Sequence, residues 1–333
     1  MPKEHHEVLS IADVDALNLL GVGDRYLKIL EEDFEGRITV RGDRIVLTGP
    51  RARVEELASV FLNLIELAKT GRALSEQDIY YALGLHRERS ERRLKELEGA
   101  VFQSGRQGAV CPKTFGQKAY VEAMQTHDIV FAIGPAGTGK TFLAIAHGLA
   151  LLRDRRVERL LLVRPAVEAG ESLGFLPGDL QEKIDPYIRP LHDALIDMVG
   201  SAKTHRLIES GVVEAIPLAY MRGRTLNQAY VVLDEAQNTT AMQMKMFLTR
   251  LGNGSQSVIT GDVTQIDLQD PAASGLVAAR RLLEGIEGIK FVDLDENDVV
   301  RHHLVRRIIA AFEGLTTGTG GPKNDGGDGK GAA

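Results

Sequence analysis

Tryptophan is absent from this 333-residue chain, and aromatic residues make up only 5% of it. We therefore do not expect a surface that binds single-stranded nucleic acid by stacking bases on many aromatic side chains. Cysteine occurs once, at Cys111, so the chain cannot form an internal disulfide. No apolar run approaches the roughly 20 residues that a membrane-spanning helix needs, and the first residues lack the apolar core of a signal peptide. These absences predict a cytoplasmic protein without a membrane partner.

Positive charge is not in excess. The chain has 40 Lys and Arg residues against 46 Asp and Glu residues, which gives a formal net charge of −6. Proteins that coat nucleic acid usually carry a net positive charge. Binding to RNA would therefore need a local basic patch or a groove that forms on assembly.

Composition divides the chain into four parts. Residues 1–85 contain short strand patterns and helical patterns, and they predict a small α+β domain. Residues 86–112 contain a charge run and a loose Gly-containing stretch, which indicates either a solvated tether or a basic contact to RNA or a partner. Residues 113–315 form the main domain, and residues 316–333 are too rich in glycine and polar residues to order themselves.

The main domain contains six apolar runs of strand length, and helical segments separate several of them. Buried strands that alternate with helices predict an α/β domain with a parallel sheet covered on both faces. The six runs are residues 129–133, 160–163, 212–216, 230–233, 257–260 and 290–292.

A phosphate-binding loop is the most specific motif of the chain. The segment G-P-A-G-T-G-K-T matches the pattern without a mismatch, and it lies between a strand-like run and a helical run, as the pattern requires. Its glycines let backbone N–H groups converge on phosphate oxygens, and the helix N-terminus adds positive potential. We expect a nucleoside triphosphate with Mg²⁺, the lysine on the β- and γ-phosphates and the last threonine on the metal. The residues are Gly134, Pro135, Ala136, Gly137, Thr138, Gly139, Lys140 and Thr141.

A second motif, Asp234-Glu-Ala-Gln, follows the apolar run at residues 230–233. An Asp at the end of a hydrophobic strand is the usual Mg²⁺ partner of a phosphate loop. Glu235 would orient and deprotonate the attacking water, which favours hydrolysis over binding alone. Without the loop upstream, an Asp-Glu pair after a strand would indicate only a solvated turn.

Two glutamines complete the predicted nucleotide site. Gln265, in Gly261-Asp-Val-Thr-Gln, follows another strand-like run and would contact the γ-phosphate or the water. Gln117 lies 17 residues before Gly134, and its amide would bond the adenine edge as donor and acceptor. The alternative for Gln117 is a glutamine on a helix surface.

The order of these motifs resembles the first RecA-like half of superfamily 1 helicases, and more narrowly the PhoH family of ATPases. The resemblance covers about 200 residues and implies a P-loop NTPase domain. The N-terminal unit resembles the small KH-like domain of the YbeZ-like branch of that family. The blocks that carry the resemblance begin at Val163 (V-R-P-A-V-E-A-G-E), Leu173 (L-G-F-L-P-G-D), Lys183 (K-I-D-P-Y-I-R-P), Met221 (M-R-G-R-T-L), Asp234 (D-E-A-Q-N) and Asp298 (D-V-V-R-H).

The resemblance implies ATP hydrolysis, a ring of subunits and a role in RNA processing, with a YbeY-type endoribonuclease as partner. The N-terminal unit lacks the G-x-x-G loop with which KH domains grip RNA. We therefore expect assembly or partner docking from this unit as much as RNA binding.

The length of the chain after Gln265 suggests an incomplete site. Only about 50 ordered residues are expected there, too few for a second RecA-like half. Charge on the transferred phosphoryl group normally needs an arginine, supplied in cis or in trans. Arg301 is the candidate, with a structural salt bridge as the alternative. A head-to-tail contact of this kind closes into a ring, and the family resemblance predicts a homo-hexamer.

Three further arginines are candidate contacts to RNA or phosphate. Arg222 and Arg224 flank a glycine before the Asp234 strand, and Arg164 ends another strand. Exposed loop arginines are the alternative for the first two, and pairing with Glu168 or Glu171 is the alternative for Arg164.

Three functions are compatible with these motifs. The first is an ATPase that remodels or unwinds RNA or loads a ribonuclease on it. The second is a nucleotide-gated scaffold for an endoribonuclease that unwinds nothing. The third, a small-molecule phosphotransferase, is disfavoured by Glu235 and by the lack of a readable acceptor site.

Overall fold

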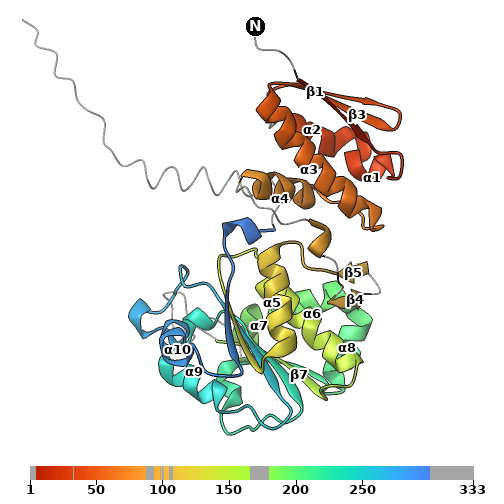
Figure 1. The fold of residues 1–333 in the computed structure, drawn as a ribbon. Coiled ribbons are helices and arrows are strands. Elements are labelled where there is room, and N and C mark those ends of the chain that lie inside the picture. Colours follow the sequence, from red (N-terminus) through yellow and green to blue (C-terminus); the bar gives the residue numbers. More distant parts are fainter. Residues whose placement is uncertain are drawn as a thin grey trace, which may run out of the picture. The chain divides into compact units, whose positions relative to one another are not determined.

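The computed structural model describes residues 5–32, 34–87, 94–97, 99, 101–104, 108–165 and 180–300. These residues form a small N-terminal unit and a larger α/β unit (Figure 1). Within them, no helix is both long enough and apolar enough to cross a membrane.

The N-terminal unit is a three-stranded antiparallel sheet with helices packed against it. The two predicted strands form the hairpin of this sheet, in the order β1-β3-β2. The long helix α3 buries the apolar face that its sequence spacing predicts, and Gly71, with a φ of 82°, follows its end. The elements are β1 (His5–Ser10), α1 (Ala16–Leu20), α2 (Arg25–Glu32), β2 (Arg37–Arg41), β3 (Arg44–Gly49), α3 (Arg51–Lys69) and α4 (Glu76–Arg87).

The segment predicted as a linker contains large apolar side chains that are buried: Leu94, Leu97, Val101, Phe102 and Val110. Leu94 and Leu97 lie in a short 3₁₀ helix and belong to the core of the N-terminal unit. The hairpin of β4 (Phe102–Ser104) and β5 (Gly108–Val110) adds apolar side chains to the core of the main domain. Parts of the segment interpreted above as a linker are therefore packed, because it carries apolar residues among its charges.

The main domain is built on a six-stranded parallel sheet. Its order is β11-β6-β10-β9-β7-β8, and all five neighbouring pairs are parallel. All six predicted strands are present, which confirms the predicted α/β fold. They are β6 (Ile129–Ile133), β7 (Arg159–Arg164), β8 (Val213–Pro217), β9 (Ala229–Leu233), β10 (Gln256–Gly261) and β11 (Ile289–Asp293).

Helices cover both faces of this sheet, so alternate strand residues enter two separate cores. Val130, Leu160 and Val232 face a core with α5 (Phe115–Thr126), α6 (Lys140–Arg153) and α7 (Leu180–Val199). Phe131, Leu161 and Leu233 face the other core, with α9 (Ala241–Leu248) and α10 (Gly275–Leu283). Burial on both faces explains why these strands read as continuous apolar runs. A further helix, α8 (Ser201–Glu209), packs beside α7.

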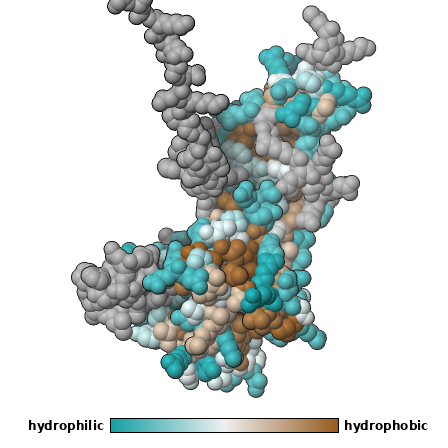
Figure 2. Space-filling model, turned by 90° about the vertical axis from the view of Figure 1, so that its left-hand side faces the viewer, coloured by the Kyte–Doolittle hydropathy of each residue, from teal (hydrophilic) through white to brown (hydrophobic). Residues whose placement is uncertain are grey.

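The side of the molecule that carries α9 and α10 exposes several apolar side chains. Met242, Val277 and Leu282 are exposed there. Figure 2 faces this side and shows apolar surface mixed with hydrophilic surface over the main domain. Scattered exposed apolar residues of this kind are normal for a globular protein.

Candidate functional site

The sheet brings the predicted motifs to one edge. Gly134 follows β6, Arg164 ends β7, Asp234 follows β9 and Asp262 follows β10. The register pairs Ile133 with the end of β10, and β9 with both β10 and β7. The carboxyl ends of parallel strands meet at one edge of a sheet, which is where ligands of open α/β sheets bind.

The phosphate loop begins directly after β6 and leads into α6. Gly137 and Gly139 have φ angles of 88° and 78°, a region that L side chains rarely adopt. A Cβ at Gly134 would collide with the carbonyl oxygen of Leu294, so this glycine is required for close packing as well. The Lys140 ammonium donates to the carbonyl oxygens of Gly134 at 2.6 Å and of Pro135 at 2.8 Å. The loop therefore wraps around the lysine that the sequence predicts as its phosphate-binding cation.

Oxygen atoms suited to Mg²⁺ converge next to the loop. The Thr141 hydroxyl donates to Asp234 Oδ1 at 2.5 Å, and the Thr260 hydroxyl donates to the same oxygen at 2.8 Å. Asp234 is buried, with 6% of its surface exposed. No group of three or more His, Cys, Asp or Glu side chains among the described residues is arranged to hold a metal. This donor set fits Mg²⁺, which takes one or two protein oxygens and completes its shell with water and phosphate.

Glu235 follows Asp234 and has an unusual backbone conformation. Its φ of 55° and ψ of 39° place it in the left-handed region, where a non-glycine residue is uncommon. Its carboxylate lies 3.2 Å from the Arg164 guanidinium and accepts a hydrogen bond from Gln237 Nε2 at 2.5 Å. A strained backbone at this position is consistent with a functional residue.

The two predicted glutamines have different surroundings. Gln265 is exposed in the turn after β10, and its N–H bonds the Asp262 carbonyl. Gln117 is buried, with 4% exposed. Its side-chain oxygen accepts from the Lys113 N–H at 2.7 Å, and its Nε2 donates to the Thr138 carbonyl at 3.0 Å. The amide therefore braces the phosphate loop, and its contact with adenine stays a prediction.

Several residues around the loop were not predicted from the sequence. The buried Tyr120 hydroxyl donates to the Lys140 carbonyl at 3.1 Å, and burial raises the pKa of this tyrosine well above 10.0, so it stays a donor. Val300 N–H donates to the Gly137 carbonyl at 2.9 Å. Gln237 lies within the Asp234-Glu-Ala-Gln block, which could have indicated it.

The three candidate RNA-binding arginines are not brought together. Arg164 lies in the nucleotide site, 3.8 Å from Asp234 Oδ2. Arg224 forms a two-pronged ion pair with Glu214, with both N···O distances at 2.9 Å. Arg222 is exposed. Arg301 lies outside the described residues.

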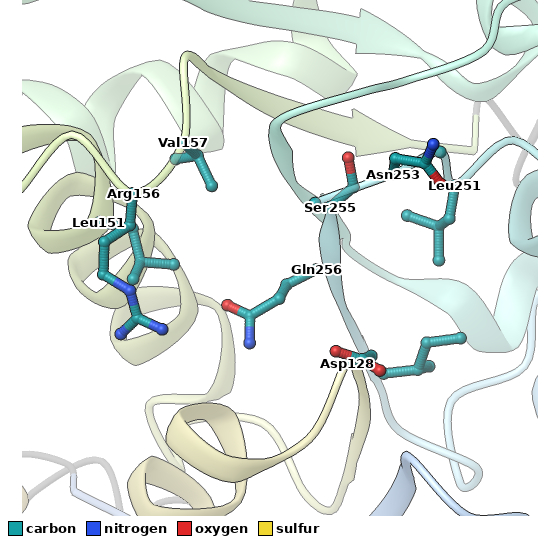
Figure 3. Close-up of a pocket in the computed structure, with 11 residues that line it drawn as sticks. Asp128, Leu151, Arg156, Val157, Leu251, Asn253, Ser255 and Gln256 are labelled. Atoms are coloured by element: carbon teal, nitrogen blue, oxygen red, sulfur yellow. The ribbon is translucent and has the colours of Figure 1, made fainter.

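A hollow of about 480 Å³ lies at the opposite edge of the sheet, at the amino ends of the strands. Figure 3 shows Arg156 and Gln256 facing it, with Asp128 nearby. None of the predicted site residues lines this hollow, so it is separate from the nucleotide site.

The parallel sheet, the phosphate loop and the adjacent carboxylates define a nucleotide-hydrolysing P-loop protein. The family model described as "PhoH-like protein" matches residues 109–313. The PhoH-like protein of Bacillus subtilis (strain 168) is 49% identical over 300 residues, which cover 90% of this chain and 94% of that protein. The PhoH-like protein of Mycobacterium tuberculosis (strain ATCC 25618 / H37Rv) is 49% identical over 296 residues, which cover 89% of this chain and 84% of that one. The chain belongs to the PhoH-like protein family, as the motifs predicted.

A solved Sulfolobus solfataricus SWI2/SNF2 ATPase core in complex with dsDNA is similar at a TM-score of 0.35 and 13% identity, over 69% of this chain and 57% of that one.

Proposed function

We propose that this protein is a Mg²⁺-dependent ATPase that couples hydrolysis to RNA remodelling, either directly or by assisting an endoribonuclease. The observation that carries the ATPase part is the convergence of Thr141, Asp234 and Glu235 beside the phosphate loop. Thr141 and Asp234 share a hydrogen bond of 2.5 Å, and the Glu235 carboxylate follows directly along the chain.

Each side chain has one task in this proposal. Lys140 neutralises the β- and γ-phosphates, and Thr141 and Asp234 hold the metal. Bound Mg²⁺ supplies positive charge that offsets the charge on the phosphates. Glu235 accepts a proton from the attacking water, whose oxygen forms the new bond to the γ-phosphorus while the bond to the ADP oxygen breaks. Gln265 orients that water or contacts the γ-phosphate, and Gln117 braces the loop.

The RNA part of the proposal is supported by family membership and by the candidate arginines. Arg164 and Arg224 form ion pairs with Glu235 and Glu214, whereas Arg222 is exposed. An RNA groove would therefore draw on residues from more than one subunit, which agrees with the proposed homo-hexamer.

The test of the ATPase is phosphate release from Mg²⁺–ATP by wild type, Lys140→Ala and Glu235→Gln. We expect Lys140→Ala to lose turnover together with nucleotide affinity. Glu235→Gln should lose about 10²- to 10³-fold in kcat while it still binds nucleotide, because only proton transfer is removed. Glu287→Gln, an exposed glutamate at the far edge of the sheet, is the matched control and should behave as wild type. Undiminished turnover in Glu235→Gln would rule out this base.

The test of the RNA role uses the same assay with and without single-stranded RNA, together with a strand-separation assay. Stimulation by RNA and ATP-dependent separation would support remodelling. Hydrolysis without either would favour the alternative, a nucleotide-gated scaffold for an endoribonuclease.

A further inference from the structure

Two side chains hold the two oxygens of the Glu235 carboxylate separately. Arg164 lies 3.2 Å from Oε1, and Gln237 donates to Oε2 at 2.5 Å. The glutamate side chain is 38% exposed, so solvent alone would leave it several rotamers. Its direction is therefore set by these two partners.

Gln237 joins Glu235 to the turn that carries Gln265. It is 1% exposed, so its amide depends on protein partners. Its Nε2 also donates to the Gln265 carbonyl at 3.1 Å, and its Oε1 accepts from the Asp262 N–H at 3.1 Å. One amide thus connects the predicted base with both ends of the turn from Asp262 to Gln265.

The side chain of the next residue, Asn238, holds the same loop without a hydrogen bond to the Glu235 carboxylate. Asn238 Nδ2 donates to Asp267 Oδ2 at 3.0 Å, and its Oδ1 accepts from the Asp267 N–H at 2.8 Å. Asn238 is 6% exposed, comparable to Gln237. The chain therefore offers two adjacent buried side-chain amides, of which only that of Gln237 bonds the Glu235 carboxylate.

We infer that Gln237 is a positioning residue that aligns Glu235 with the turn of Gln265, so that the proposed base and the glutamine proposed to contact the γ-phosphate or the water move as one unit. This inference rests on the proposed ATPase function. A displacement of the turn would be transmitted through the Gln237 amide to the Glu235 carboxylate, and the base would be aligned only when the turn is in place. Misplacing a catalytic group by about 1 Å costs on the order of 10²-fold in rate.

The first experiment compares Gln237→Met with Asn238→Leu in steady-state ATP hydrolysis. Both substitutions nearly preserve side-chain size and remove hydrogen bonds that hold the loop. We expect Gln237→Met to lower kcat by about 10- to 100-fold with KM changed by less than about 2-fold, because ground-state binding is unaffected. Asn238→Leu should lower the melting temperature while its kcat stays within about 3-fold of wild type. Equal kcat losses in the two variants would overturn the inference, since they would reflect loosening of the loop.

The second experiment repeats Gln237→Met in a Glu235→Gln background. If Gln237 acts through Glu235, the second substitution should change kcat by less than about 2-fold, because the carboxylate that it positions is gone. Multiplicative losses would show an independent structural effect and overturn the inference. Gln237→Glu, which keeps the length but places like charge against Glu235, should show the same loss as Gln237→Met and serves if the methionine variant does not fold.

Failure of the proposed ATPase function and failure of the positioning role of Gln237 would give different results. If wild type releases no phosphate from Mg²⁺–ATP, the proposed ATPase function is wrong and the role of Gln237 falls with it. If wild type is active and Glu235→Gln is impaired, but Gln237→Met turns over at the wild-type rate, only the positioning role is wrong.

Discussion

The imidazole of His147 is buried in α6, with its ring against Tyr230. Its Nε2 has no hydrogen-bond partner among the described residues. Burial, assisted by the charge of Arg156, lowers the pKa of His147 from 6.5 to about 4. The folded protein therefore holds this histidine neutral at pH values where the unfolded chain protonates it.

This histidine predicts an acid-dependent loss of stability. Because the folded pKa lies below the unfolded pKa, the unfolded state takes up the proton first as the pH falls. Wild type should lose unfolding free energy from about pH 6.5 down to about pH 4, by ~3 kcal/mol in total. His147→Leu should lack this component, so the difference between the two proteins in urea unfolding should depend on pH over that window. A constant difference would contradict the assignment.

Single side chains show where sequence reasoning succeeds and where it stops. The spacing of the phosphate loop predicts the roles of Lys140 and Thr141, because a local pattern of eight residues is enough to propose them. The same reasoning predicts an adenine contact for Gln117, which stays a prediction, but it did not anticipate the hydrogen bonds of this amide to Lys113 N–H and the Thr138 carbonyl. The partner of a buried amide depends on segments brought near by folding, and sequence spacing does not contain that information.

At the level of elements, the first turn of α5 packs directly against the segment after β11. The Asp298 carboxylate accepts from the Thr114 hydroxyl at 2.5 Å and from the Asp295 N–H at 3.0 Å. Burial raises the pKa of Asp298, although these hydrogen bonds oppose the rise. A Cβ at Gly116 would collide with this carboxylate, so the two elements meet only because residue 116 is glycine.

Two helix glycines should therefore respond to alanine with opposite signs. Gly116→Ala forces α5 away from Asp298 and should destabilise the protein by about 1–3 kcal/mol, since it weakens buried hydrogen bonds. Gly84 lies inside α4 with open space around it, and Gly84→Ala should stabilise by up to ~1 kcal/mol through helix propensity. Thermal unfolding of both variants checks the prediction, and a stabilising Gly116→Ala would contradict the packing described for α5.

The strands of the main sheet could be predicted because strands buried on both faces are continuous apolar runs. Strand β1 (His5–Ser10) could not be predicted, since its two apolar residues, Val8 and Leu9, are adjacent and only Leu9 is buried. The order of the strands in the sheet could not be predicted from the sequence either. It places β10 between β6 and β9, and so brings the Thr260 hydroxyl onto Asp234, a contact between residues 26 positions apart.

At the scale of the whole molecule, the proposed ring places an arginine from one subunit in the site of the next. Mixing Arg301→Ala with Lys140→Ala subunits tests this arrangement. In a random equal mixture about a quarter of the sites should combine an intact loop with an intact neighbouring arginine, so hydrolysis should recover although neither variant alone is active.

The control for that mixture is Lys140→Ala combined with a Lys140→Ala, Arg301→Ala double variant, which should recover nothing. Absence of recovery in the first mixture would contradict donation in trans by independent sites. Mass measurements on each sample give the number of subunits and so test the proposed hexamer at the same time.

The hydrogen bond from Val300 N–H to the Gly137 carbonyl connects the phosphate loop directly to the last residue that the structure describes. Thermodynamic coupling is reciprocal, so a nucleotide that shifts Gly137 must alter the energy of the backbone at Val300 by the same amount that a pull at Val300 alters nucleotide affinity. Nucleotide binding at the loop would therefore change the backbone at Val300. In the other direction, a force or a binding event that displaces Val300 would slow or speed nucleotide exchange.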